Sequence, residues 1–293
     1  MKVILLLLFL SIYVYADEEG RAGLTANYYF NSQTGTMIVD GFRGIYSFKE
    51  ITYRPWQSFT PLIKHLKISG SVTSVGVVAF MLCENLQTLE IGEMVQYLDT
   101  RSFQSCTSLK SIVLPSNVLV IYPFAFLGCT SLSSIVISGD MIVWDRGAFW
   151  GCDKLQKVFY FGKNPPDYIK TEDCNFPPIG CGTPTDTISC APFYCGCDKL
   201  GNISVPYDYN GTEFVGMPIS KLNQGENING IFKGSCGNDC QYEINMTSHV
   251  MKISGNGEMK DYENYKECPW FGLTELIEEI LVVQLNLSTI FLK

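Results

Sequence analysis

The sequence predicts a solenoid of stacked coils that is mainly β, and two observations lead to this fold class. A cysteine recurs every 23 residues through the middle of the chain. Each of these cysteines has a phenylalanine three residues before it and a leucine three residues after it. The four sets are Phe80, Cys83 and Leu86; Phe103, Cys106 and Leu109; Phe126, Cys129 and Leu132; and Phe149, Cys152 and Leu155. A fixed period of this length with apolar residues in phase is typical of a solenoid.

Each repeat is expected to contain one tight turn and one short strand. The Ala-Phe-x-x-Cys part is too short for a full helix and fits a helical or 3₁₀ turn. The following part alternates with a period of two, as at Leu89 and Ile91, which favours a strand. One coil of this size cannot bury enough apolar surface alone, so neighbouring coils must stack. Stacking would place the four phenylalanines and four cysteines in one continuous spine.

Two related modules flank the predicted solenoid, which covers residues 72–162. Residues 28–68 align with residues 242–282 at a constant offset of 214, and Pro55-Trp56 then aligns with Pro269-Trp270. We therefore expect a β-rich lead-in module at 17–71, which caps the first coil, and a second, truncated lead-in module at 236–293.

The segment between the solenoid and the second module, residues 163–235, departs from the repeat. It is rich in proline and cysteine, although Leu200, Ile203 and Val205 keep the spacing of a final strand. We interpret it as an irregular, cysteine-rich exit cap and linker.

The first 16 residues have the pattern of a secretory signal peptide. An apolar run from Val3 to Val14 follows Met1-Lys2, and Ala16 supplies a small residue for cleavage. An anchor helix is the alternative, but the run is short for a bilayer. We expect an extracellular protein, secreted or at the cell surface. Four N-x-S/T sequons fit this compartment and are expected glycosylation sites: Asn202, Asn210, Asn245 and Asn286.

The cysteines fall into two groups with different expected chemistry. The four cysteines of the repeat could form two disulfides, but parallel stacking disfavours the required geometry, so we expect buried thiols. For the remaining eight we expect disulfides, because an exported chain meets an oxidising compartment. A zinc site is the alternative, although the spacings only partly match paired zinc ligands. The eight are Cys174, Cys181, Cys190, Cys195, Cys197, Cys236, Cys240 and Cys268.

These residues resemble the BspA-like surface proteins, which carry the treponemal type of leucine-rich repeat, and most of all their versions from parasitic protists. The resemblance lies in Ala79-Phe80, Cys83, Leu86, Leu89 and Ile91 with their three further copies, and in Ile253 to Met259 with Pro269-Trp270. It implies a leucine-rich repeat solenoid and a surface antigen or adhesin that binds host proteins or cells. It implies no catalytic residue.

Composition and motifs argue against several classes of function. The net charge of −8 and the absence of a Lys/Arg cluster disfavour nucleic acid as a partner. The two histidines, His65 and His249, have no nucleophile nearby in the sequence, and no phosphate-loop, hydrolase or kinase signature is present. We expect no enzyme, no small-molecule substrate, no cofactor and no metal.

A binding surface is expected on the outward face of the repeat strands. The residues between the inward-pointing apolar positions form a column of Glu90, Val113, Val136 and Phe159, with Thr88, Ser111, Ser134 and Lys157 beside it. Three apolar residues in a row could contact a protein. The alternative is that such residues merely favour strands.

The function expected from these features is a binding protein, adhesin-like, that contacts a protein or a cell surface, including that of a host, through the solenoid. The alternative is a structural or coat protein that assembles through the ends of the solenoid. A third possibility is an enzyme with a site in the cysteine-rich segment. The sequence leaves the oligomeric state open.

Overall fold

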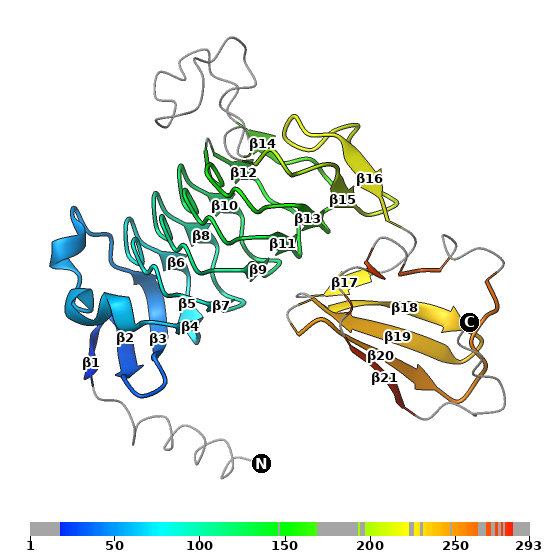
Figure 1. Cartoon of the computed structure of the whole chain (residues 1–293), viewed down its shortest axis with the longest axis horizontal. Coiled ribbons are helices and arrows are strands. Elements are labelled where there is room, and N and C mark those ends of the chain that lie inside the picture. The colour runs from blue at the N-terminus through cyan, green and yellow to red at the C-terminus, as the bar shows by residue number, and fades with distance from the viewer. Residues whose placement is uncertain are drawn as a thin grey trace.

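The computed structural model describes most of the chain after its first 17 residues (Figure 1). The described residues are 18–145, 147–168, 193, 197–222, 226–228, 231–246, 248–262, 268–270, 273–274, 277 and 279–283. The predicted signal peptide and Asn286 lie outside them. No helix among the described residues is long and apolar enough to cross a membrane.

The chain begins with an antiparallel meander that leads into the solenoid. Strands β1 (Glu18–Arg21), β2 (Gly23–Asn31) and β3 (Thr36–Ile45) pair in sequence order. Two 3₁₀ helices, η1 (Ile51–Tyr53) and η2 (Gln57–Leu62), then return the chain to β4 (His65–Ile68), which pairs with β3 in parallel. This parallel pair turns the meander into the first rung of the stack.

The solenoid continues the same sheet, one parallel strand per coil. The strands that follow β4 are β7 (Thr88–Ile91), β9 (Ser111–Leu114), β11 (Ser134–Ile137), β13 (Lys157–Tyr160), β15 (Ile203–Val205) and β16 (Ile219–Lys221). Corresponding residues of successive repeats stand side by side, as in Ile112↔Ile135↔Val158. The mainly β, leucine-rich repeat solenoid predicted from the sequence is therefore confirmed.

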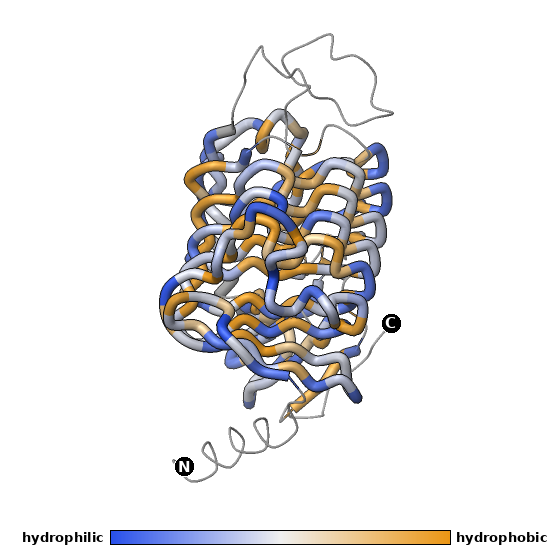
Figure 2. Tube along the Cα trace, turned by 90° about the vertical axis from the view of Figure 1, so that its left-hand side faces the viewer, coloured by the Kyte–Doolittle hydropathy of each residue, from blue (hydrophilic) through white to orange (hydrophobic). Residues whose placement is uncertain are grey.

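A second, narrower parallel sheet forms another side of the coils. Its strands are β6 (Ser74–Val75), β8 (Tyr97–Leu98), β10 (Val120–Ile121), β12 (Val143–Trp144) and β14 (Asp167–Tyr168), while β5 (Ser71–Val72) pairs with β3. Each of these strands is the start of one repeat. Figure 2 shows that apolar positions recur from coil to coil along the stack.

An aromatic stack runs through the core between these sheets. The rings of Phe80, Phe103, Phe126 and Phe149 lie parallel to within 13°, with neighbouring centroids 5.2 to 5.6 Å apart. Trp56 extends the stack at the N-terminal end, 5.3 Å from Phe80. All five side chains are fully buried. The stack therefore links the lead-in meander to every repeat.

The repeat cysteines form a second buried row beside the phenylalanines. Cys83, Cys106, Cys129 and Cys152 are thiols, as expected, and are fully buried. Each of the last three donates its S–H to the carbonyl of the phenylalanine that precedes the previous cysteine, at 3.4 Å. The thiols thus satisfy a carbonyl at each turn.

A fifth coil continues both rows, which corrects one expectation about the cysteines. Phe193 stacks on Phe149 with centroids 5.4 Å apart, and the Cys197 thiol donates to the Phe149 carbonyl at 3.2 Å. Cys197 is therefore a ladder thiol and forms no disulfide. This coil could not be recognised from the repeat pattern, because Cys197 follows Cys152 by nearly two periods, whereas the other repeat cysteines are one period apart. Cys174, Cys181, Cys190 and Cys195 lie outside the described residues.

A third sheet lies beyond the solenoid. Its strands are β17 (Glu226–Ile228), β18 (Ile231–Gly237), β19 (Cys240–Asn245), β20 (Val250–Gly255) and β21 (Glu279–Val283), paired in that order. The first pairs are antiparallel, and β21 pairs with β20 in parallel. This order of pairings repeats that of β1 to β4.

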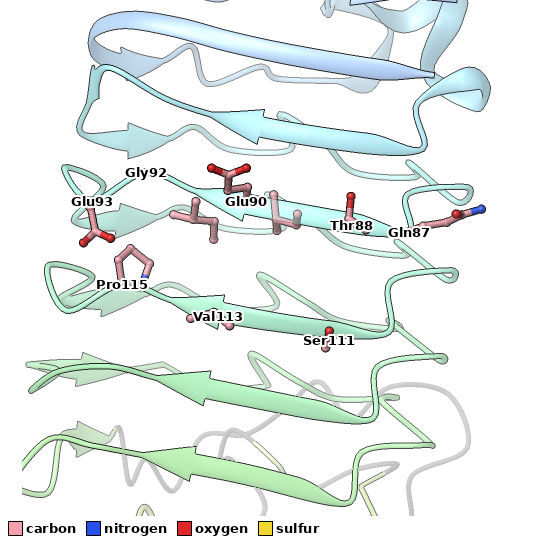
Figure 3. A pocket seen from close by; sticks show the side chains of 10 residues that line it. Gln87, Thr88, Glu90, Gly92, Glu93, Ser111, Val113 and Pro115 are labelled. Carbon is pink, nitrogen blue, oxygen red and sulfur yellow. The ribbon is translucent and has the colours of Figure 1, made fainter. Parts of the chain in front are cut away.

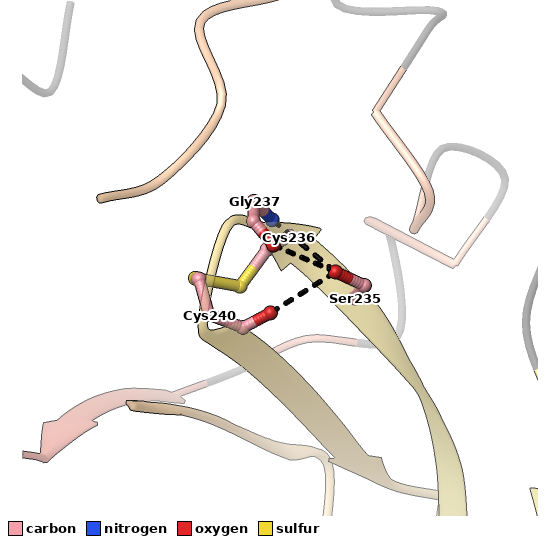
Figure 4. Close-up of a disulfide and its surroundings, with 4 residues drawn as sticks. All are labelled: Ser235, Cys236, Gly237 and Cys240. Carbon is pink, nitrogen blue, oxygen red and sulfur yellow. Dashed lines mark hydrogen bonds between the residues drawn. A yellow bond between two sulfur atoms is a disulfide. The ribbon is translucent and has the colours of Figure 1, made fainter. Parts of the chain in front are cut away.

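A disulfide closes the turn between β18 and β19. Cys236 and Cys240 are bonded to each other and fully buried (Figure 4). The Ser235 hydroxyl beside it donates to the carbonyl oxygens of Gly237 and Cys240, at 2.9 and 3.3 Å. This bond agrees with the expectation of a disulfide at these two cysteines. Within the described ranges, no group of three or more His, Cys, Asp or Glu side chains is arranged to hold a metal ion.

Candidate protein-binding surface

The predicted binding column exists as a row across the main sheet. Glu90 lies beside Val113, Val113 beside Val136, and Val136 beside Phe159 in the strand registers. Lys67 on β4 extends the row at its N-terminal end, and Ser204 on β15 at the other. The register follows because the 23-residue period keeps each strand in phase with the next.

Exposure along this row is high at Lys67 and Glu90 and lowest at Val136 and Phe159. Lys67 and Glu90 are exposed and form an ion pair with a 2.5 Å separation between Nζ and Oε1. Val113 is half-buried. Val136 and Phe159 retain only 3% of their surface each. The column is therefore open at β4 and β7 and closed at β11 and β13.

The closed end corrects the expectation that the whole column faces solvent. Val136 and Phe159 belong to a buried cluster with Leu222, Phe232 and Tyr242, which lie in or next to the third sheet. Phe161, directly after β13, packs against Phe232 with ring centroids 5.4 Å apart. The third sheet covers this part of the column because three outward apolar residues give it a surface to bury. A partner cannot contact Val136 or Phe159 in this arrangement.

A hollow of about 460 Å³ lies at the open end, over β7 and β9 (Figure 3). The two strands pair at Glu90 and Val113, whereas β9 and β11 pair over four residues. Thr88, Glu90 and Ser111 line the hollow from the strands. The hollow thus combines carboxylate, hydroxyl and apolar groups within one site.

Negative charge dominates the hollow. Glu93 lines it together with Glu90, and partial burial raises the pKa of the Glu93 carboxyl above its ordinary value. Lys67 partly offsets the charge of Glu90. Val113 and Pro115 supply the apolar side of the lining. Such a lining can accept hydrogen bonds from a cationic group and pack against an apolar one.

The two histidines lie in different parts of the fold. His65 is the first residue of β4, and His249 lies in the turn between β19 and β20. His65 Nδ1 is 2.8 Å from the Thr88 hydroxyl oxygen. His249 occupies the β19–β20 turn, where its backbone N–H donates to the carbonyl of Asn245 at 2.8 Å.

Three of the four sequons lie in the described part of the chain. Asn202 and Asn210 are exposed, and their amide nitrogens donate to Ser220 and Asn164 at 2.8 and 2.9 Å. Asn245 is half-buried, and its side-chain oxygen accepts from the backbone of Ser248 at 2.9 Å. Glycosylation at these asparagines stays a prediction.

One functional group that was not predicted from the sequence is a buried cation, Arg54. The Arg54 guanidinium is 3% exposed and donates to the carbonyl oxygens of Val78, Ala79 and Met81. Its Nε and Nη2 also donate to the Gln57 side chain. The only available signal was its position next to Pro55-Trp56, where nothing distinguishes a buried arginine from an exposed one.

Comparison with known protein families gives one match. A family model described as "BspA type Leucine rich repeat region" matches residues 49–165 in six copies. A comparison with curated proteins found no match. The matched range contains the aromatic stack from Trp56 to Phe149 and the row of repeat thiols.

Solved structures of leucine-rich repeat proteins are also similar. A protein from Eubacterium ventriosum is 16% identical, with a TM-score of 0.40, over 49% of this chain and 44% of its own. The T. pallidum Leucine Rich Repeat protein is 19% identical, with a TM-score of 0.37, over 64% of this chain and 85% of its own. A leucine rich cell surface protein from Faecalibacterium prausnitzii is 14% identical, with a TM-score of 0.32, over 65% and 71%. This chain thus spans less than half the length of the Eubacterium ventriosum chain. On the match to the family model, residues 49–165 are similar to a BspA type leucine-rich repeat region.

Proposed function

We propose that this chain is a secreted or cell-surface binding protein, adhesin-like, that contacts a protein or the surface of a host cell through its solenoid. The repeat family supports a role in protein interaction. The apolar leader of the sequence supports export, and the sequons fit an extracellular compartment. The same reading predicts that the mature chain begins at Asp17.

The hollow over β7 and β9 carries the proposal. It lies at the open end of the outward column, where Glu90 and Val113 are accessible while Val136 and Phe159 are covered. Direct contact with the partner is therefore assigned to Glu90 and Val113. The covered pair contributes by holding the third sheet against the solenoid.

The lining indicates the chemistry of the partner. Glu90 and Glu93 favour a lysine or arginine side chain, and Val113 with Pro115 favours an apolar neighbour beside it. A protein segment with a basic residue next to an apolar residue fits both requirements. Because the whole chain carries a net charge of −8, a basic partner would also be attracted from a distance. Binding should then weaken as salt is added.

The test measures binding of the purified mature chain to host cells and to a panel of matrix proteins. The double variant Glu90→Ala/Glu93→Ala, at two exposed residues of the lining, should lower affinity at least tenfold and leave the unfolding temperature unchanged. Tyr97→Lys is the matched control, since Tyr97 is exposed on β8 in the other sheet of the solenoid. Unchanged binding by the double variant, or an equal loss in the control, would reject the hollow as the binding site.

A further inference from the structure

We propose that the outer edge of β21, together with the ring of Trp270, is a docking surface for a polypeptide other than a second copy of this chain, one that carries a leucine-rich repeat strand. The incoming strand would pair with β21 in parallel. This site is separate from the hollow over β7 and β9, so the two proposals stand or fall independently. If the proposal holds, this edge is the specific contact surface for the alternative function, which is assembly through the ends of the solenoid.

The third sheet reproduces the lead-in meander residue by residue. Tyr28 faces Val39 and Phe30 faces Met37, while Tyr242 faces Ile253 and Ile244 faces Met251, all at the offset of 214. The parallel pair follows the same offset, because Met37↔Leu66 corresponds to Met251↔Ile280.

The turns and glycines of the two copies also correspond. Gly41 and Gly255 both adopt a positive φ, of 137° and 134°. In the hairpin turns, the side-chain oxygens of Asn31 and Asn245 accept from the backbone N–H groups of Thr34 and Ser248, respectively. Such agreement in pairing, turn and dihedral angle makes β21 the structural equivalent of β4.

The tryptophans occupy equivalent places as well. Trp56 meets Tyr28 edge-on with centroids 5.6 Å apart, and Trp270 meets Tyr242 edge-on at 5.2 Å. Phe48 flanks Trp56 as Tyr262 flanks Trp270, again at the offset of 214.

In the first copy, the first repeat covers this whole surface. Strand β7 pairs with β4 over four residues, with Leu66 beside Leu89 and Ile68 beside Ile91. Phe80 stacks on Trp56, whose indole N–H donates to the Ala79 carbonyl at 2.9 Å. Leu66 and Ile68 are at most 2% exposed and Trp56 is fully buried.

In the second copy, the described residues of the same surface are far more exposed. Ile280 and Val282, the equivalents of Leu66 and Ile68, are 53% and 43% exposed. Leu281 and Val283 are 45% and 41% exposed, and Trp270 is half-buried. In the part of the chain that the structure describes, no strand pairs with the outer edge of β21. An exposed edge strand with four successive apolar residues and no charge readily pairs with another strand, because its backbone N–H and C=O groups have no partner strand.

The duplication identifies the occupant. At the equivalent edge the molecule itself places a parallel strand with apolar residues at alternate positions, preceded by a phenylalanine that stacks on the tryptophan. The partner is therefore a polypeptide with a Phe followed nine residues later by Leu-x-Ile, as in Phe80, Leu89 and Ile91. Backbone pairing would supply affinity and the two apolar side chains specificity.

One difference shows where the second site should be weaker. Cys268 stands where the first copy has Arg54, which binds three carbonyl oxygens of the first repeat. Docking at β21 therefore rests on strand pairing and on Trp270, without that cation.

The first experiment uses a fluorescent peptide of residues 76–93, the segment that covers Trp56 and β4 in the first copy. Fluorescence anisotropy with the full mature chain should show saturable binding. Replacing Leu89 and Ile91 of the peptide by serine, or using the protein variant Ile280→Lys/Val282→Lys, should weaken binding at least tenfold. Phe42→Lys, at an exposed residue of the first meander, is the matched control and should bind normally.

A second measurement removes the entropic cost of binding a free peptide. Appending residues 80–162 after Lys293 raises the effective concentration of a repeat coil at β21. Hydrogen exchange of the β21 amides should slow at least tenfold in the extended chain, and the Ile280→Lys/Val282→Lys variant should abolish the slowing. Absence of protection in the extended chain overturns the proposal. Dimerisation of the unextended chain that this double variant abolishes would overturn it too, because a second copy would then be the occupant.

Discussion

The rings of Phe126 and Phe149 stack within 3° of parallel, with their centroids 5.2 Å apart. This pair is one step of a stack that begins at Trp56 and ends at Phe193. Each ring therefore contacts the coil before it and the coil after it. Loss of one ring should weaken two interfaces at once, which is the dependence expected of a solenoid.

The first prediction follows from that stack. Phe126→Ala should lower the free energy of unfolding by about 3–5 kcal/mol, because it leaves a cavity between two coils. Tyr122→Ala is the control, since Tyr122 is 37% exposed in the same repeat and should have a much smaller effect. Urea unfolding followed by circular dichroism measures both. Equal effects would show that the aromatic stack does not stabilise the solenoid.

The second prediction concerns the row of thiols and pH. Burial raises the pKa of Cys83 and of Cys197 to about 12, from an ordinary value of 9.0, and raises those of Cys106 and Cys152 as well. The folded chain therefore binds more protons than the unfolded chain between these values. Its stability is fully present below pH 9 and is lost as the pH rises towards 12, by about 1.4 kcal/mol per pH unit for each thiol.

Denaturant unfolding between pH 8 and pH 11 tests this dependence. The variant Cys83→Ala should have a shallower loss of stability than the parent chain, because one buried thiol no longer titrates. The same thiols should resist alkylation in the folded chain and react once it is unfolded. Rapid alkylation of Cys83 in the folded state would contradict the buried ladder.

The third prediction reverses one that the sequence alone suggested. The sequence places Val136 and Phe159 on an outward binding surface, where charged residues would weaken partner binding without affecting stability. Both are 3% exposed beneath the third sheet. Phe159→Asp should therefore lower the unfolding temperature and speed hydrogen exchange in β18. Glu90→Ala, at the open end of the same column, should change neither.

The comparison of sequence and structure shows what a repeat can predict. The period fixed the strands, their register and the rows at Phe80 and Cys83, because identical residues in stacked coils must meet. It could not predict how the third sheet packs on Phe159, since that contact joins segments outside the period. The predicted boundaries of the modules, glycosylation and the leader stay predictions.

Internal duplication was the second strong signal. The offset of 214 predicted that β19 to β21 would repeat β2 to β4, and the registers agree. Local sequence gave no such guide to Arg54 or to the fifth coil at Phe193, because a buried charge and an interrupted period leave no pattern.

The fourth prediction concerns Ser105, a non-glycine residue with a positive φ in a turn of the coil. Ser105 adopts a φ of 60°, and the equivalent residues of the next two repeats are Gly128 and Gly151, at 72° and 70°. A side chain costs about 1 kcal/mol in this left-handed region, whereas glycine does not. Ser105→Gly should thus stabilise the chain by up to about 1 kcal/mol. Ser108→Gly, where φ is not positive, should lower stability instead, as thermal unfolding can show.

The fifth prediction concerns the buried cation that joins the lead-in meander to the first repeat. Arg54 donates to the carbonyl oxygens of Val78, Ala79 and Met81, and desolvation lowers its pKa from the ordinary value. Arg54→Met should lower the free energy of unfolding by about 3 kcal/mol, because it leaves three carbonyl groups without their shared donor. Arg54→Lys should recover little, since a single ammonium cannot reproduce the planar fork.

Arg43→Met is the control for this substitution. Arg43 is exposed on β3, and its loss should change stability by less than about 0.5 kcal/mol. Hydrogen exchange separates the local effect from the global one, because amide exchange at β4 and β7 should increase first in the Arg54→Met variant. If exchange increased equally along the whole solenoid, Arg54 would not be the link between the meander and the first coil. The equivalent position in the second copy is Cys268, so the two lead-in modules differ at the residue that joins the first of them to a repeat.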